Sequence, residues 1–503
     1  MNPSTDAYGS HGGPVQLFYL KKGAPRRPTV SHGEGIYLWD TKGRRYIDAS
    51  SGPIASNLGH ANPRVIAASD RQMRQVAYAS RAFFENDANA DLADIVTRLA
   101  GPGLERAFFV SGGSEATESA MKLARQYAVT QGQASRWKVL SRNPSYHGGT
   151  MGAIAISGDP VSEAAFGPMT RLMPKVPAPF TYRLPEGHTA ESYAEHCAAA
   201  LEETILREGP ETVLAFFLEP VGGLATGALV APDRYYARVR EICSHHGVLL
   251  VFDEVMSGAG RTGQFLAAHH WPEARPDIVT LAKGIGAGYA PLGAVLASRD
   301  MVDSVAEAGG FMHGFTYASN PLSCAIGHAV VSETVDRGLI PNAAAMGDRL
   351  RQRLQEVQKG SRVMGDIRGK GLLMAIEIVG DRDSKAILPA HTQAIQRIVD
   401  LGMERGLLLY SRRTANGQFG EWLMVAPPLI VDAPQIDTIA GLIGETLAAF
   451  EKQLGSAAGA PRHHARSASS PVRRRASAPP RRGCMPPTAG TSSSTICAIP
   501  RRP

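Results

Sequence analysis

The sequence is short of the features that mark membrane, secreted and disulfide-rich proteins. No apolar run approaches the ~20 residues of a membrane-spanning helix, so we expect no membrane span. The first residues, MNPSTDAYGSHGG, lack the apolar core of a secretory signal. The five cysteines have neither metal-ligand spacing nor the density of a disulfide framework. These absences predict a protein of the reducing cytoplasm.

Several catalytic signatures are missing as well. No HExxH motif, CxxC pair or carboxylate cluster is present, so we predict no metal site. The absence of a GxSxG elbow argues against a serine hydrolase. The glycine-rich loop at 284–288 follows a lysine and has no acidic residue about 20 positions further on, so it does not match a dinucleotide-binding fingerprint.

Negative charge is absent from the last part of this 503-residue chain. From residue 455 onward there are nine arginines and no Asp, Glu or Lys, so the formal charge of +7 falls to −2 without them. The basic balance is therefore no argument for a nucleic-acid partner, and none is predicted. The Arg/Ser/Ala/Pro-rich residues 456–503 are predicted to be a disordered basic tail. A solvated tail, an out-of-frame artefact and an anion-binding arm all remain open for it.

What the sequence does contain is a regular alternation of apolar strands and amphipathic helices. The expected strands lie at 107–110, 137–141, 213–219, 248–254, 277–282 and 292–297. This rhythm predicts an α/β fold with a mostly parallel sheet and helices on both faces. The proline-rich residues 160–195 interrupt it and are expected to form a long surface excursion.

The remaining segments predict a second, smaller domain. Residues 35–52 favour two short strands around a turn at 40–43, which is typical of a hairpin. Residues 336–455 mix helices and strands and predict an α+β domain. We therefore divide the chain into an N-terminal arm and hairpin that joins the small domain (1–62), a large domain (63–335) and the small domain (336–455).

Two residues at predicted strand ends stand out chemically. Asp253 ends the apolar run 248–252, and Lys283 follows the run 278–282. Ligand sites of open α/β sheets lie at such carboxyl ends. A buried lysine can act as an imine-forming nucleophile, and an acid opposite a pyridine nitrogen can keep that ring protonated. For a lone Lys-Gly the simpler reading is a surface charge, and Asp253 alone could cap a helix.

A glycine-rich turn at 111–118, SGGSEATE, predicts an anion cradle. It follows the strand at 107–110 and opens an amphipathic helix at Ser114. Backbone N–H groups at a helix N-terminus, with the Ser114 hydroxyl, suit a phosphate. An ordinary capped helix is the alternative. The turn is not a Walker A loop, because no Gly-Lys-Ser/Thr follows.

Three further residues sit at positions suited to a cofactor. Tyr146 follows the strand at 137–141 and can stack on a planar ring; a partly buried loop tyrosine is the alternative. Glu219 ends the strand at 213–219, where it serves either the site or a helix cap. Thr316, in a loop before a helix, either reaches a phosphate or belongs to a turn.

Together these motifs resemble the class III aminotransferases, which are pyridoxal-phosphate enzymes of fold type I. The resemblance covers about residues 30–450. Its motifs, in order, are LGH (58–60), SGGSEATE (111–118), YHG (146–148), EPVGG (219–223), FDEVMSGAGRTG (252–263), LAKGIGAGYAPLGA (281–294), HGFTYASNPL (313–322), RGKGLL (368–373) and APPLIV (426–431).

The resemblance implies a cofactor, pyridoxal 5′-phosphate, and roles for matching residues. Lys283 would carry the cofactor as a Schiff base and shuttle the proton during catalysis, and Asp253 would pair with the pyridinium nitrogen. The implied cofactor contacts are Gly113, Ser114, Tyr146, His147, Glu219, Asp253, Lys283 and, from a neighbouring subunit, Thr316. A homodimer, or a dimer of dimers, would be the working unit.

The substrate side departs from part of the family. Members that act on ornithine or 4-aminobutyrate commonly have Gln where this chain has Met256. Related ω-aminotransferases often bind a substrate carboxylate with an arginine near Arg412 and Arg413, and the sequence does not choose between the two or exclude plain surface charge. Phe84, with its neighbour Phe83, and Ile54 are weaker candidates for the pocket wall.

The sequence thus predicts an aminotransferase that moves an amino group from an amino acid, ω-amino acid or amine to a keto acid such as pyruvate. Other class III activities remain as alternatives: the diaminopelargonate-forming aminotransferase, an aminomutase or a decarboxylating aminotransferase. A non-catalytic protein that binds pyridoxal phosphate is the alternative from a different class.

Overall fold

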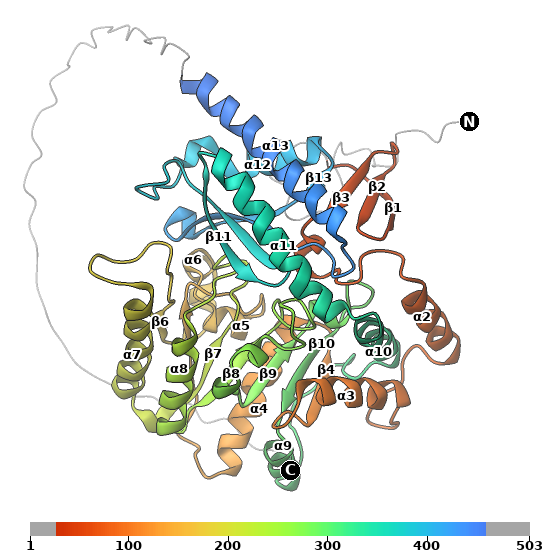
Figure 1. Ribbon diagram of the computed structural model, residues 1–503. Coiled ribbons are helices and arrows are strands. Elements are labelled where there is room, and N and C mark those ends of the chain that lie inside the picture. The colour runs from red at the N-terminus through yellow and green to blue at the C-terminus, as the bar shows by residue number, and fades with distance from the viewer. Residues whose placement is uncertain (1–26, 459–503) are drawn as a thin grey trace, which may run out of the picture. The chain divides into compact units, whose positions relative to one another are not determined.

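A computed structural model describes residues 27–458 (Figure 1). Three β-sheets organise the described residues, one of seven strands and two of four. The predicted arm before residue 27 and the predicted tail beyond residue 458 lie outside the described residues. The boundaries at 62 and 335 between a large and a small domain stay a prediction.

The seven-stranded sheet carries the order β4-β10-β9-β8-β7-β5-β6. Neighbouring strands are parallel from β9 to β6, whereas β10 runs antiparallel to both β9 and β4. The prediction of a mostly parallel sheet is confirmed, with one reversed strand. The strands are β4 (Arg106–Val110), β5 (Lys138–Asn143), β6 (Lys175–Pro177), β7 (Val213–Leu218), β8 (Leu249–Asp253), β9 (Ile278–Leu281) and β10 (Gly293–Ala297).

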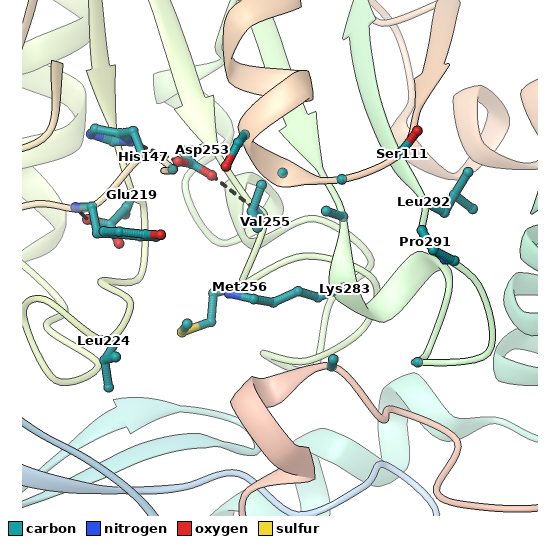
Figure 2. A pocket seen from close by; sticks show the side chains of 18 of the residues that line it. Ser111, His147, Glu219, Leu224, Asp253, Val255, Met256, Lys283, Pro291 and Leu292 are labelled. Atoms are coloured by element: carbon teal, nitrogen blue, oxygen red, sulfur yellow. Dashed lines mark hydrogen bonds and ion pairs between the residues drawn. The ribbon is translucent and has the colours of Figure 1, made fainter. Parts of the chain in front are cut away.

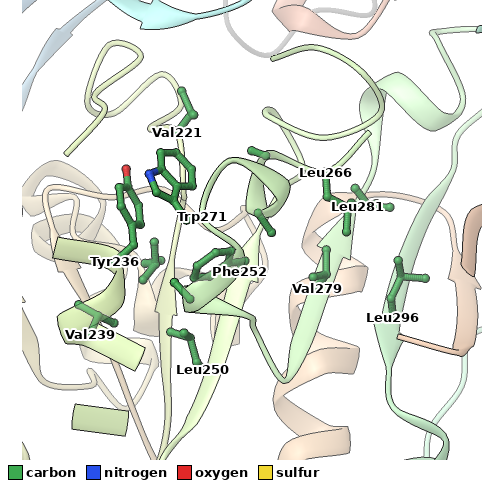
Figure 3. Close-up of a cluster of buried hydrophobic side chains, with 14 of the residues drawn as sticks. Val221, Tyr236, Val239, Leu250, Phe252, Leu266, Trp271, Val279, Leu281 and Leu296 are labelled. Atoms are coloured by element: carbon green, nitrogen blue, oxygen red, sulfur yellow. The ribbon is translucent and has the colours of Figure 1, made fainter. Parts of the chain in front are cut away.

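Helices cover both faces of this sheet because its strands are apolar on both sides. Val251 of β8 packs with α4 (Gly113–Thr130) and α9 (Arg299–Glu307), while Leu250 and Phe252 pack with α7 (Ala190–Glu208) and α8 (Asp233–His246). Figure 3 shows the second cluster, in which the rings of Tyr236 and Trp271 stack with their centroids 3.8 Å apart. Alternate side chains of β8 thus pack into the apolar helix layers on the two faces of the sheet.

The expected surface excursion at 160–195 is only partly right. The segment contains α6 (Pro160–Phe166), a 3-10 turn (Gly167–Met169) and β6, and α7 begins within it. The interpretation failed for β6 because three residues are too few to show a pattern. Val176 of β6 is buried, and Pro177 is tolerated because the strand lies at the sheet edge.

The N-terminal hairpin pairs with a short strand from the C-terminal part of the chain. The strands β1 (Val30–Glu34), β2 (Tyr37–Asp40) and β3 (Arg45–Asp48) pair antiparallel in order, and β13 (Leu407–Leu408) adds to β3 in parallel. Figure 1 shows the red hairpin beside the blue C-terminal elements. β1 was not expected, because its residues are largely exposed and carry no apolar pattern.

The third sheet has the order β11-β12-β15-β14 and is antiparallel throughout. Its strands are β11 (Met364–Lys370), β12 (Leu373–Ile378), β14 (Tyr410–Thr414) and β15 (Gly420–Val425). The segment 363–379 forms two strands joined by a turn at Gly371 (φ +56°). The helices of this region are α11 (Leu339–Gly360), α12 (Ala394–Glu404) and α13 (Ala433–Ala458).

The other helices connect these sheets. α10 (Pro321–Asp336) packs against α2 (Pro63–Gln75) and α3 (Asp87–Ala100), while α1 (Ser51–Ile54) and α5 (Met151–Ile156) are short. None of the helices described between residues 27 and 458 is long and apolar enough to cross a membrane.

Candidate functional site

A cavity of about 310 Å³ lies at the carboxyl ends of the parallel strands (Figure 2). Four of its polar side chains come from four neighbouring strands. His147 lies in the loop after β5, Glu219 follows β7, Asp253 ends β8 and Lys283 follows β9. Because these strands are parallel and adjacent, side chains far apart in the sequence meet at one edge of the sheet.

The Asp253 carboxylate is buried and held by three donors. Its Oδ1 accepts from the backbone N–H of Val255 at 3.1 Å and from the Thr280 hydroxyl at 3.3 Å. Its Oδ2 lies 2.8 Å from Nδ1 of His147, which carries the proton of this contact because a carboxylate can only accept. Figure 2 draws two of these bonds above Lys283. The donors leave the carboxylate little freedom to rotate.

His147 is itself fixed in place. Its backbone N–H donates to the Ser157 hydroxyl at 2.9 Å, and its ring meets the edge of Phe217 with the centroids 6.0 Å apart. Its Nε2 is buried and has no partner among the described residues. The imidazole therefore acts on the site chiefly through Asp253.

Lys283 begins the 3-10 turn Lys283–Ile285 directly after β9. Its φ of +45° is rare for a residue with a side chain. The turn is closely packed, because a Cβ on the next residue, Gly284, would lie 2.9 Å from the Ala259 side chain. Burial lowers the pKa of Lys283, and the charges of Asp253 and Glu219 oppose that shift. Figure 2 shows the lysine extending across the cavity toward Met256.

Glu219 forms the other acidic wall of the cavity. Its Oε1 accepts from the Gly223 N–H at 2.9 Å and its Oε2 from the Tyr146 N–H at 3.4 Å. Burial raises the pKa of Glu219, against the lowering effect of His147. Beneath it, the buried Arg142 donates to the Glu219 carbonyl at 2.6 Å.

The N-terminus of α4 provides a cradle for an anion. Its cap residue is Gly112, and no side chain of the described residues caps the first turn. A Cβ on Gly113 would lie 2.8 Å from Val255, and one on Gly148 would lie 2.7 Å from the Ser114 hydroxyl. The two glycines thus let the three loops approach one another closely. The helix dipole and free N–H groups of the first turn favour a phosphate at this point.

Most of the residues predicted for the cofactor line this one cavity. These are Gly113, Ser114, Tyr146, His147, Glu219, Asp253 and Lys283. Thr316 does not line it in the same chain; it is exposed, and its carbonyl accepts from the Tyr78 hydroxyl at 3.2 Å. That position leaves Thr316 available to a second subunit.

The substrate candidates lie apart from the cavity wall. Ile54 is almost fully buried in the apolar core, so it does not line the cavity itself; its neighbour Ala55 does. Phe84 is 66% exposed and borders a different cavity, together with Ser319. An apolar residue near a motif carries no signal that separates core, pocket and surface, so a role of Ile54 and Phe84 in the substrate pocket stays a prediction.

Arg412 and Arg413 point to opposite faces of β14. Arg413 pairs with the buried Glu421 at 2.8 Å, directly across the ladder. Arg412 lies opposite Trp422, whose Nε1 donates to the carbonyl of Leu224, a residue of the cavity wall. Only Arg412 thus lies on the face of the strand that leads toward the cavity.

Sequence reasoning missed some of the residues that shape the site. Leu224, Val255, Pro291 and Leu292 line the cavity but are ordinary apolar loop residues with no chemical signature. Arg142 carried a usable signal, because a charged residue directly after an apolar strand run has to find a buried partner.

The comparisons with known proteins agree on one family. The family described as Aminotransferase class-III matches residues 20–447. The uncharacterized aminotransferase YodT of Bacillus subtilis is 36% identical over 429 residues, which cover 85% of this chain and 96% of YodT. The hypotaurine/taurine–pyruvate aminotransferase of Paracoccus denitrificans is 34% identical over 425 residues, covering 82% of this chain and 90% of that protein.

Solved structures of transaminases are similar to this fold. An (S)-enantioselective ω-transaminase from Thermomicrobium roseum superposes with a TM-score of 0.80 at 35% identity, covering 88% of this chain and 96% of that one. The ω-transaminase of Pseudomonas jessenii in complex with PMP gives a TM-score of 0.82 at 30% identity, covering 88% and 97%. The prediction of an α/β fold of type I is confirmed by these neighbours.

Proposed function

The chain belongs to the class III aminotransferases and is a pyridoxal-phosphate-dependent transaminase, and from this premise we propose that it transfers an amino group from an amino acid, ω-amino acid or amine to a keto acid such as pyruvate. The observation that carries this proposal is the meeting of Lys283 and Asp253 in one cavity beside an uncapped helix N-terminus. Pyruvate is the acceptor in the names of two relatives, the hypotaurine/taurine and the putrescine aminotransferases.

The cavity fits pyridoxal phosphate. Bound there, the cofactor would supply an aldehyde that combines with amines and a ring that accepts electrons while its nitrogen is protonated. Gly113 and Ser114 would hold the phosphate at the start of α4, and Tyr146 would lie on the ring. Asp253 would hold the proton on the ring nitrogen, with His147 fixing its orientation.

Lys283 is the residue that we assign to proton movement. Burial lowers the pKa of its ammonium group, so its neutral form is more accessible at neutral pH than that of a solvated lysine. A neutral Nζ would hold the cofactor through its aldehyde and would accept a proton from a bound substrate. The charges of Glu219 and Asp253 oppose this shift, which helps Nζ to accept and hold that proton.

Arg412 is the arginine that we assign to a substrate carboxylate. Its face of β14 leads toward the cavity, whereas Arg413 lies on the opposite face of the strand, where it pairs with Glu421. A guanidinium presents paired N–H donors that match a carboxylate. This assignment favours donors with an amine at one end and a carboxylate at the other.

We further propose that the working unit is a homodimer, or a dimer of dimers. Tyr78, Phe83, Phe84, Met312 and Tyr317 are exposed on the segments 78–84 and 312–317, which contact each other through the rings of Tyr78 and Tyr317. An exposed apolar patch of this kind marks an interface. A second copy there would bring its Thr316 toward the phosphate cradle.

Light scattering during size exclusion tests the assembly. The wild type is expected at twice or four times the chain mass, and a double Phe83→Glu/Phe84→Glu variant is expected at the mass of one chain with little activity. A monomeric wild type with full activity would contradict the proposal.

We also assign the protein to the cytoplasm. This assignment is supported by the cysteines of the described residues, Cys197, Cys243 and Cys324, which are free and buried.

A donor panel tests the function directly. Each donor is incubated with pyruvate or with 2-oxoglutarate, and the keto product and amino product are measured separately. Transamination by the wild type but not by Lys283→Ala supports the proposal. A cofactor band near ~420 nm that depends on Lys283, without turnover for any pair, would indicate a binding protein instead. Product formed with loss of carbon dioxide, or with the amine moved within one molecule, would indicate another class III activity.

A further inference from the structure

The loop 220–229, which follows β7 and Glu219, forms part of the cavity wall without a helix or strand of its own. Val221 and Leu224 of this loop line the cavity, and Leu224 is half-buried while the rest of the loop is buried. Figure 2 shows Leu224 on the side of the cavity far from Ser111, which precedes the anion cradle. The loop therefore bounds the side of the cavity that the cradle leaves to a substrate.

Two side chains of the third sheet fasten this loop from outside the cavity. Trp422 of β15 donates its Nε1–H to the Leu224 carbonyl at 2.9 Å. Arg368 of β11 donates from Nε to the Gly227 carbonyl at 2.6 Å and from Nη2 to the Thr226 carbonyl at 3.4 Å. Because the loop is buried and belongs to no helix or sheet, these bonds supply partners that its backbone otherwise lacks.

The loop lies as close to the third sheet as a glycine allows. A Cβ on Gly227, whose φ is +60°, would lie 2.6 Å from the Trp422 ring and 2.7 Å from Nη2 of Arg368. The Gly227 N–H donates to the Gly223 carbonyl at 2.9 Å, and the Gly223 N–H donates to Oε1 of Glu219 at 2.9 Å. A shift of Gly227 relative to the sheet thus moves the cavity wall with it.

Arg368 is itself fixed by several contacts. Its Nη2 pairs with Glu377 at 2.8 Å and its Nη1 with Asp366 at 3.2 Å. Its guanidinium carbon lies 5.2 Å from the ring centroid of Trp422 and 5.9 Å from that of Phe180. This combination of stacking with bonds in several directions requires the planar fork of an arginine, which a lysine does not have.

We propose that Arg368, a residue outside the cavity, positions the loop 220–229 and thereby determines how large a donor side chain fits beside Leu224. Arg368 is a positioning residue, because it acts through the backbone of the loop and does not line the cavity. The effect on donors rests on the proposed aminotransferase function, whereas the effect on the loop does not.

The direction of the effect follows from where the guanidinium lies. With Arg368 in place, the Leu224 side chain is held in one position, and a donor side chain that overlaps it is rejected. Without the guanidinium, the Gly227 carbonyl loses its charged donor, and the loop gains room to retreat on the side of the sheet. A small donor does not reach this wall and is affected little.

The substitution Arg368→Met tests the position of the loop. Methionine keeps an apolar stem beside the two rings but donates no hydrogen bond, and Glu377 keeps Arg183 as its partner, so the variant is expected to fold. Hydrogen exchange of the holoenzyme, followed by mass spectrometry, measures the protection of residues 222–229. We expect exchange there to be about tenfold faster, which is the effect of losing one hydrogen bond from a charged donor.

Arg351→Met is the matched control for this measurement. Arg351 of α11 also donates to two backbone carbonyls, those of Ile367 at 3.3 Å and Gly369 at 2.7 Å, but both belong to β11. We expect this variant to leave the exchange of residues 222–229 and the choice between donors unchanged.

The choice between donors is measured with alanine and phenylalanine, which differ by a phenyl group. Alanine is the amino product of pyruvate, so an enzyme that uses pyruvate also reacts with alanine in reverse. The donor half-reaction is followed by the cofactor's absorbance without any acceptor. We expect the ratio of the rate constants for phenylalanine and alanine to rise about tenfold in Arg368→Met, the low end of the effect of pocket fit. Leu224→Ala is expected to raise the same ratio and to add little to Arg368→Met, because both changes act on one wall.

Each outcome decides one part of the proposal. Unchanged exchange of residues 222–229 in Arg368→Met would overturn the positioning role. Faster exchange with an unchanged donor ratio, or no effect of Leu224→Ala on that ratio, would overturn the role in selectivity. If Arg368→Met does not fold, Arg368→Lys keeps the charge without the fork and is read in the same way, with smaller changes expected. If alanine does not react in the wild type, the proposed transfer to pyruvate fails, while the exchange measurement still decides whether Arg368 positions the loop.

Discussion

The substitution Asp253→Asn isolates the electrostatic contribution of one buried carboxylate. Asparagine has almost the same shape, and its single oxygen can keep the bonds from the Val255 N–H and the Thr280 hydroxyl. Its amide nitrogen then faces Nδ1 of His147 and takes the place of the Asp253 Oδ2 atom, which lies 2.8 Å from that nitrogen. The imidazole can accept there only if its proton moves to Nε2, which is buried and without a partner among the described residues.

The expected magnitudes follow from that geometry. Stability should fall by about 1–3 kcal/mol, the cost of one disturbed buried hydrogen bond, so the protein still folds and binds the cofactor. Turnover should fall about 10²–10³-fold, the loss measured when one preorganised electrostatic group is removed from an active site. The reason is that Asn cannot hold the proton on the ring nitrogen.

The assay measures cofactor content and the donor half-reaction of the same preparation. Glu254→Gln is the matched control, because the neighbouring Glu254 faces away from the cavity and accepts from the N–H groups of Ala267 and Ala268. We expect Glu254→Gln to keep most of its turnover while Asp253→Asn loses it with the cofactor bound. Near-normal turnover of Asp253→Asn would refute the role assigned to Asp253.

Three further predictions follow from single contacts. Gly148→Ala should weaken cofactor binding by about tenfold or more, because a φ of +134° is unfavourable for alanine and the added Cβ would lie 2.7 Å from the Ser114 hydroxyl. A fluorescence titration of the cofactor-free protein measures this affinity. An unchanged affinity would speak against a phosphate site at the start of α4. Glu219→Gln should lower the pKa of Lys283 further, because it removes a negative charge that stabilises the ammonium form. The pH at which an amine reagent labels half of Lys283 in the cofactor-free protein should therefore shift downward. An upward shift would contradict this reasoning. Burial raises the pKa of Glu254 to about 7, so the folded state keeps a proton that the unfolded state releases from about pH 4.5. The stability that this proton confers is full below about pH 4.5 and is lost as the pH rises to about 7, by up to ~3 kcal/mol. Glu254→Gln should therefore flatten the pH dependence of thermal unfolding.

The positions of the strands could be predicted from their apolar runs, but the direction of each strand in the sheet could not. The runs behind β7, β8 and β9 are continuous and buried, and each was predicted to within a residue or two. The reversal of β10 was not predictable from its residues, because a run such as Gly293–Ala297 has the same apolar pattern in either direction. Tertiary pairing between β4 and β9 decides it.

The site could be predicted where chemistry and strand ends coincide. Asp253, Glu219 and Lys283 follow buried strands that are neighbours in the sheet, so their convergence follows from the parallel order. The substrate side could not be predicted, because its contacts are made by loops and by a strand from another sheet. The pairing of Arg412 with Asp159 joins residues 253 positions apart, and neither has a local pattern that announces the other.

We propose that the amine of Lys283 carries the cofactor. Borohydride reduction of the purified protein, followed by digestion and mass spectrometry, shows where the cofactor is attached. We predict one pyridoxyl group per chain, attached to Lys283, and none in Lys283→Ala. A reduced, active protein with no label at Lys283, or with the label on another lysine, would contradict the account.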